Sequence, residues 1–73
     1  MGILDFFSRV RTARPEEIRA FMKAHKPGEY QLVDVRTLRE YERGHLPGAR
    51  LIPVNELPAR LSEIERGKPT FVY

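Results

Sequence analysis

The sequence predicts an α/β fold in which helices cover a parallel β-sheet. Along its 73 residues, segments with the apolar pattern of strands alternate with segments that have the spacing of amphipathic helices. Residues 30–35 form a mostly apolar run, which is typical of a strand buried on both faces of a parallel sheet. Strands separated by helices imply right-handed parallel crossovers, so we expect an α/β sandwich.

The first strand and helix are predicted from residue 10 onward. Val10 to Ala13 have the pattern of a short strand, and Pro15 then suits the first position of a helix. Glu16 and Glu17 favour the positive start of that helix. Pro27-Gly28 ends it. Its apolar residues repeat at helical spacing: Ile18, Phe21 and Met22.

A second strand is expected at Tyr30 to Val35, followed by a short helix. Thr37 and Glu40 have the spacing of a capping box, in which each side chain accepts a hydrogen bond from the backbone of the other residue. Gly44 ends this helix. His45-Leu46-Pro47-Gly48 is then a turn, because proline fixes its own φ and glycine tolerates a positive φ.

The remaining segments complete two further strands and one helix. Ala49 to Ile52 form the third predicted strand, and Thr70 to Tyr73 the fourth. Asn55 is expected to cap the helix between them, which Gly67 and Pro69 end. That helix carries an apolar stripe: Leu57, Leu61 and Ile64.

Composition narrows the classes of function. Thirteen basic and ten acidic residues give a net charge of +3, but the signs alternate along the chain, so no nucleic-acid partner is expected. The absence of cysteine excludes disulfides and cysteine-ligated zinc within these residues. His25 and His45 stand apart in the sequence, so neither a metal site nor a cofactor is expected.

Residues 1–9 are expected to be an apolar extension that precedes the domain at residues 10–73. The segment is too short to span a membrane and lacks the charged start and cleavage site of a secretory signal. It should form a short helix packed on the domain or on a partner, and a membrane-surface anchor is the alternative. The chain is therefore expected in the cytoplasm, without a membrane span.

From Leu32 to Tyr73 the sequence resembles the rhodanese family of sulfurtransferases, while residues 10–31 match more loosely. The resemblance lies in these segments: Leu32-Val33-Asp34-Val35-Arg36, Glu40-Tyr41, Gly44-His45-Leu46-Pro47-Gly48-Ala49, Ile52-Pro53, Glu56-Leu57 and Thr70-Phe71-Val72-Tyr73. It implies a three-layer α/β/α rhodanese-like fold with a parallel sheet. Only the first four strands and their helices would be present, so the domain is expected to be incomplete.

The resemblance also implies a catalytic cysteine directly after Tyr73, in a loop whose N–H groups bind an anion. Such a cysteine takes sulfane sulfur from a donor such as thiosulfate as a persulfide and passes it to a thiol or to cyanide. The 73 residues contain no such residue, so the chain by itself is expected to be inactive. One hypothesis is that selenocysteine follows, encoded by UGA. The alternatives are a nonsense mutation that truncates the gene, or a deliberate choice to express only these residues.

Several residues are candidates for the surroundings of that site. Asp34 and Arg36 lie at the carboxyl end of the second strand, the edge where open α/β sheets form ligand crevices. They are expected mainly to form a structural ion pair, and the alternative is that they orient the loop or influence a bound anion. The other residues are expected to have structural roles. Glu40 caps the short helix and Gly44 ends it, and His45, Pro47 and Gly48 belong to the turn that follows.

Two other functions stay open at this stage. One is a rhodanese-like module that binds a partner without catalysis. The other is a cysteine phosphatase or arsenate reductase of the related fold, which would need a longer anion-binding loop after Tyr73.

Self-association of the chain is also expected. The sheet order that the resemblance implies places a further strand beside Thr70–Tyr73, and without that strand the backbone there would form an open edge. The Val10–Ala13 strand would lose its only neighbour. The expected result is a dimer or higher assembly through edge pairing or face packing between chains, or else a rearranged N-terminal segment that covers the gap.

Overall fold

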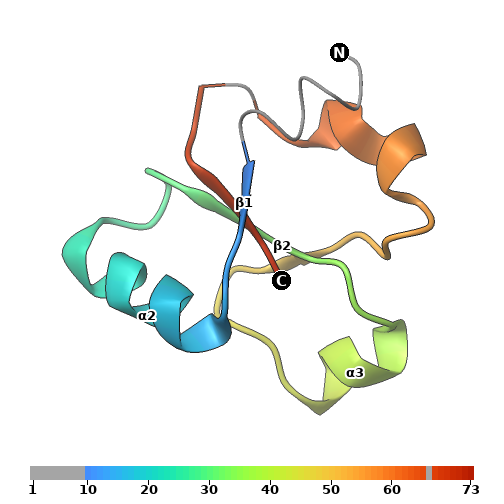
Figure 1. Cartoon of the computed structure of the whole chain (residues 1–73), viewed down its shortest axis with the longest axis horizontal. Coiled ribbons are helices and arrows are strands. Elements are labelled where there is room, and N and C mark those ends of the chain that lie inside the picture. Colours follow the sequence, from blue (N-terminus) through green and yellow to red (C-terminus); the bar gives the residue numbers. More distant parts are fainter. Residues whose placement is uncertain (1–9, 66) are drawn as a thin grey trace.

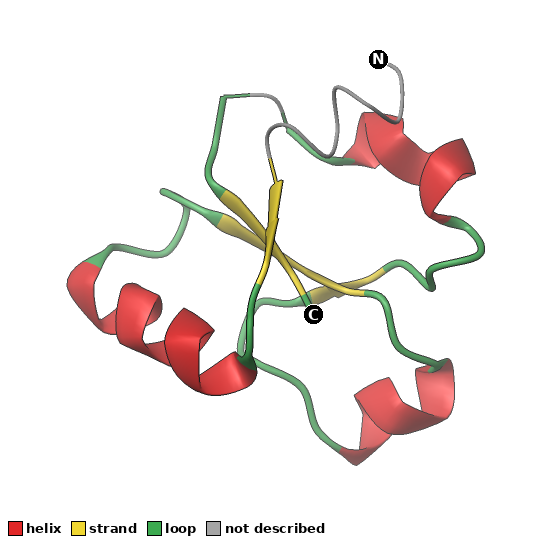
Figure 2. Cartoon of the chain, viewed as in Figure 1, coloured by secondary structure: helices red, strands yellow, loops and turns green. Residues whose placement is uncertain are grey.

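The computed structural model describes residues 10–65 and 67–73. Its centre is a four-stranded parallel sheet in the order β1-β4-β2-β3, with the helices around it (Figures 1 and 2). The strands are β1 (Val10–Thr12), β2 (Gln31–Asp34), β3 (Arg50–Leu51) and β4 (Thr70–Val72). The helices are α2 (Pro15–Ala24), α3 (Leu38–Arg43) and the 3₁₀ helix η1 (Leu57–Glu63). The predicted α/β class and parallel sheet are confirmed.

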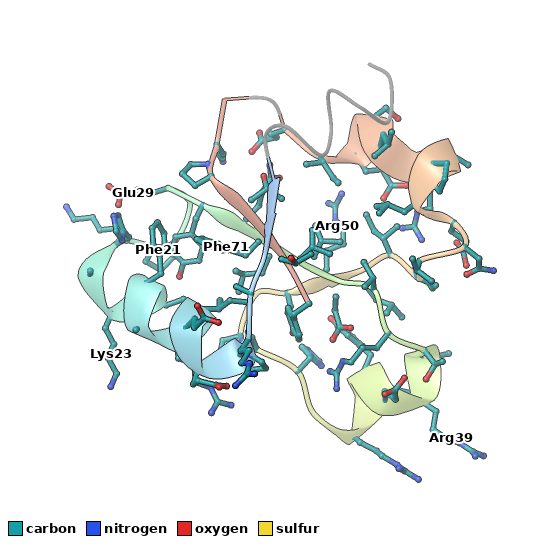
Figure 3. The ribbon with its side chains drawn as sticks, viewed as in Figure 1. Phe21, Lys23, Glu29, Arg39, Arg50 and Phe71 are labelled. Atoms are coloured by element: carbon teal, nitrogen blue, oxygen red, sulfur yellow. The ribbon has the colours of Figure 1, made fainter. Side chains whose placement is uncertain are left out.

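Helix α2 begins and ends where the sequence indicates. Pro15 is its first residue, and the Glu17 carboxylate accepts a hydrogen bond from the Arg14 N–H at 3.1 Å. Ile18 is fully buried. Phe21 packs against Phe71 of β4, with ring centroids 4.7 Å apart (Figure 3). This contact places the helix on the sheet face that carries Phe71.

Two apolar clusters lie on opposite faces of the sheet, because successive side chains of a strand point to opposite sides. One contains Leu32 and the residues that α2 and the turn before β3 contribute: Ile18, Leu46 and Ala49. The other contains Val33 and Val72 with residues from the segment after β3, from η1 and from its C-cap position: Ile52, Leu57, Leu61 and Ile64. The sheet is therefore the middle layer of three.

The helix after Asn55 differs from the prediction. It is a 3₁₀ helix with Glu56 at its N-cap position and no side-chain cap, and Arg60 has non-helical backbone angles. The chain enters it through successive turns, in which the Glu56 N–H donates to Pro53 C=O and the Leu57 N–H to Val54 C=O. Because these turns already satisfy the first N–H groups, the Asn55 cap is wrong. Burial of the Leu57, Leu61 and Ile64 stripe is confirmed.

The expected open edge at β4 is also wrong. Residues Val10 to Thr12 pair in parallel with Thr70 to Val72, and the Ala13 N–H continues the ladder to Val72 C=O at 3.2 Å. Strand β4 therefore has a neighbour on each side. The first predicted strand thus occupies the place where the gap was expected, and association of chains by face packing stays a prediction. Because β4 is paired on both sides, edge pairing between chains is not expected there. The helix predicted within residues 1–9 lies outside the described residues.

The turn before β3 is confirmed and suggests a direct test. Pro47 and Gly48 occupy its centre, the Ala49 N–H donates to Leu46 C=O at 3.0 Å, and Gly48 has a φ of 81°. A Cβ at Gly48 would meet no atom within 4 Å, so only backbone strain opposes a side chain. We expect Gly48→Ala to lower the free energy of unfolding by about 1 kcal/mol.

Asparagine tolerates this backbone region, so Gly48→Asn should restore part of that loss. Urea unfolding of the three proteins measures both effects. Equal stability of Gly48→Ala and the parent chain would show that the turn relaxes to a negative φ.

Candidate functional site

Asp34 and Arg36, the two site residues expected from the sequence, form an ion pair. This pair lies where the carboxyl ends of β2 and β4 run side by side. Asp34 is fully buried, and its carboxylate accepts four hydrogen bonds from Arg36 at 2.7 to 3.1 Å, one from the backbone N–H and three from the guanidinium. Arg36 Nη2 also donates to Gly44 C=O at 2.8 Å. The side chain therefore connects the end of β2 with the end of α3.

The electrostatics of this pair favour its charged form. Burial raises the pKa of Asp34, but the side-chain and backbone hydrogen bonds from Arg36, together with its positive charge, outweigh burial and hold the pKa below its usual value. The hydrogen bonds to Asp34 in turn raise the pKa of Arg36. The Arg36 side chain is 32% exposed, so this cation stands at the carboxyl edge with solvent on one side.

Tyr73 joins the same group, a feature that the sequence reasoning missed. Its N–H donates to Val33 C=O, and its own C=O accepts from the Val35 N–H. Its hydroxyl accepts a hydrogen bond from the Leu46 N–H at 3.0 Å, and the Arg36 guanidinium carbon lies 5.5 Å from its ring centroid. Burial is the largest cause that raises the pKa of Tyr73. No sequence pattern pairs residues 46 and 73.

Glu40 and His45 make local contacts instead. The Thr37 hydroxyl accepts from the Glu40 N–H, and the Glu40 carboxylate accepts from the Thr37 N–H and hydroxyl, so the predicted capping box is confirmed. These hydrogen bonds lower the pKa of Glu40, and the bond from the Thr37 backbone N–H has the largest effect. His45 stacks on Tyr41 with centroids 3.6 Å apart, and its Nδ1 lies 2.8 Å from Tyr41 C=O.

A hollow of about 370 Å³ lies away from this group. Its walls include two Pro-Gly pairs, Pro27-Gly28 and Pro47-Gly48, together with Arg50 and Glu63. Asp34, Arg36 and Tyr73 do not line it. Pro47 and Gly48, which the sequence analysis expected to serve structure, therefore border this hollow, and the ion pair of Asp34 and Arg36 lies outside it.

The described residues contain no cluster of three or more side chains that could hold a metal ion. None of the helices in those residues is long and apolar enough to cross a membrane. The arrangement at the carboxyl edge supplies the cation of Arg36, fixed by Asp34, and a strand end that is hydrogen-bonded to β2.

Comparison with known proteins gives one family match. Residues 15–73 match the family model described as Rhodanese-like domain. The uncharacterized protein YqhL of Bacillus subtilis is 43% identical over 65 residues, which are 88% of this chain and 47% of that protein. No solved structure matches the chain significantly.

Two further relatives carry different descriptions. A protein of Allochromatium vinosum named Sulfurtransferase is 38% identical over 42 residues, 58% of this chain and 39% of that protein. The HTH-type transcriptional regulator Rv0324 of Mycobacterium tuberculosis is 42% identical over 52 residues, 71% of this chain and 23% of that protein. The chain spans less than half the length of each of these relatives.

Proposed function

This chain belongs to the rhodanese-like domain family, and we propose on that premise that it forms the amino-terminal part of a sulfurtransferase domain. In the proposed domain a cysteine or selenocysteine directly after Tyr73 accepts the sulfur. The family match over residues 15–73 carries the proposal, and the relative named Sulfurtransferase supports it.

The proposed reaction has two displacement steps. The thiolate or selenolate attacks the outer sulfur of thiosulfate, the S–S bond breaks, and sulfite leaves with the bonding electrons. A thiol or cyanide then attacks the bound sulfur and releases the original nucleophile. Such nucleophiles react as anions, so nearby cations and loop N–H groups accelerate the first step.

The geometry at the carboxyl edge is compatible with this chemistry. Strand β4 lies between β1 and β2, and its carboxyl end is near the middle of the molecule (Figure 1). A residue after Tyr73 would begin its loop beside Arg36, whose positive charge favours a thiolate or persulfide anion. Asp34 fixes the guanidinium through its side-chain hydrogen bonds.

Thiosulfate-to-cyanide sulfur transfer tests the proposal. The whole protein that carries this chain should form thiocyanate, and the 73 residues alone should form none above background, because they contain no thiol. The control is the whole protein with serine in place of the residue after Tyr73. Thiocyanate formation by that control, or none by the whole protein with either thiosulfate or a persulfide donor, would contradict the proposal.

A second candidate is a rhodanese-like module that binds a partner without catalysis. The relative named as a transcriptional regulator favours it, because this chain matches only 23% of that protein. Under this alternative the whole protein would not accept sulfur from thiosulfate. The same assay therefore separates the two functions.

A further inference from the structure

Tyr73 is held at both its backbone and its side chain. The backbone makes two hydrogen bonds to β2, in which Tyr73 N–H donates to Val33 C=O at 3.1 Å and Val35 N–H donates to Tyr73 C=O at 2.9 Å. Two such bonds are usual for a residue at the end of a parallel strand. The side-chain contacts are what set this residue apart.

The phenol reaches a segment that is distant in the sequence. Its hydroxyl accepts the Leu46 N–H, 27 residues away, at the first residue of the turn before β3. Its ring lies under the Arg36 guanidinium, which is itself bound to Asp34 and to Gly44 C=O. One side chain thus links the end of β4 to β2, to the end of α3 and to the turn.

The contacts of Tyr73 also restrict the position of the residue that follows it in the whole protein. A nucleophile and its anion-binding loop need placement within about 0.5 Å, which requires supporting residues whose own positions are fixed. A strand end fixed only by its backbone can still fray, whereas two side-chain contacts, one to the Leu46 N–H and one to the Arg36 guanidinium, resist displacement in further directions. The apolar surroundings of Tyr73 strengthen its hydrogen bond to Leu46.

We propose that Tyr73 is a positioning residue for sulfur transfer, whose hydroxyl, through Leu46, fixes the carboxyl end of β4 and thereby the start of the nucleophile's loop. This inference rests on the proposed function. Tyr73 does not react itself. Its hydroxyl acts through the backbone that leads into the reacting group.

Tyr73→Phe in the whole protein tests the inference, and Tyr41→Phe is the matched control. The Tyr41 hydroxyl donates to Ala49 C=O at 2.7 Å, so both variants remove one phenol hydrogen bond to the same turn, at its two ends. Only Tyr73 directly follows β4 (Thr70–Val72). The measurements are kcat and KM for thiosulfate, together with the melting temperature of each variant.

We expect both variants to melt at similarly lowered temperatures. Tyr73→Phe should lower kcat about tenfold with KM nearly unchanged, since misplacement of the nucleophile acts on the chemical step. Tyr41→Phe should leave kcat within about twofold of the parent.

Equal kcat losses in the two variants would overturn the inference, because the effect would then be one of stability alone. An unchanged kcat in Tyr73→Phe, or failure of that variant to fold, would also overturn it. If the parent protein transfers no sulfur, the proposed function fails instead, and the two failures are therefore distinguishable.

Discussion

Ile52→Ala is expected to lower the free energy of unfolding by about 3 to 4 kcal/mol, because it leaves a cavity between the sheet and η1. Ile52 is fully buried in the cluster that joins β2, β4 and η1. A chain of this length has only about 4 to 11 kcal/mol of stability in total. The variant should therefore lose a third or more of the stability of the chain and unfold at a clearly lower urea concentration, as circular dichroism during urea titration would show.

Val54→Ala provides the control for this prediction. Val54 lies two residues further along the same segment but is 65% exposed, so its truncation should change stability by less than about 0.5 kcal/mol. Similar losses in the two variants would mean that the segment after β3 does not pack on the sheet as described. The stripe on η1 would then have no partner.

Asp34→Ala is expected to cost about 1 to 3 kcal/mol, since it leaves the Arg36 guanidinium and backbone N–H without their acceptor. Asp34 is the fully buried partner of the pair, and Arg36 is partly exposed, which limits the cost. Chemical denaturation at pH 7 measures the effect. An unchanged stability together with lost anion binding would favour the alternative in which the pair acts on a bound anion.

Asp34 should also make stability depend on pH in acid. Its pKa in the folded chain lies below the ordinary value of 3.8, because the hydrogen bonds and charge of Arg36 outweigh burial. Between the folded and unfolded pKa the unfolded chain binds more protons, so the stabilisation is complete above about pH 4 to 5 and is lost as pH falls through the folded pKa. Asp34→Asn should remove this dependence.

The measurement is the difference in unfolding free energy between the parent chain and Asp34→Asn, taken at steps from pH 6 down to pH 2. We expect the difference to be constant near pH 6 and to shrink with acid. A difference that grows toward low pH would mean that the carboxyl group is protonated in the folded chain and that the ion pair contributes nothing.

Local elements were predictable from the sequence because short-range chemistry specifies them. Pro15 and the spacing of Ile18 predicted α2, and the structure has both in those roles. Thr37 and Glu40 are three residues apart, so their capping box needs no information from the rest of the chain. The Pro47-Gly48 turn is fixed in the same way by the backbone preferences of its two residues.

The candidate site was predictable only in part. Asp34 and Arg36 were recognised because they lie at the carboxyl end of a buried strand, at the edge where such sheets bind ligands, and they are only two residues apart in the sequence. Tyr73 was assigned to a strand alone. Its hydrogen-bond partner Leu46 lies 27 residues away in the sequence. Nothing in the sequence around a tyrosine at the end of a strand predicts which distant N–H will donate to its hydroxyl.

By itself, the sequence determined the α/β class, the order of the elements, the two buried faces of β2 and the resemblance that led to the family. Tertiary structure alone decided which strands are neighbours and which distant groups meet. Strand β1 lies against β4 because the free N–H and C=O groups of a strand edge pair with whichever strand reaches them, and sequence separation does not limit that choice. Asn55 does not cap the helix for a related reason. The turns that begin at Pro53 and Val54 already satisfy the N–H groups that its side chain would have bound.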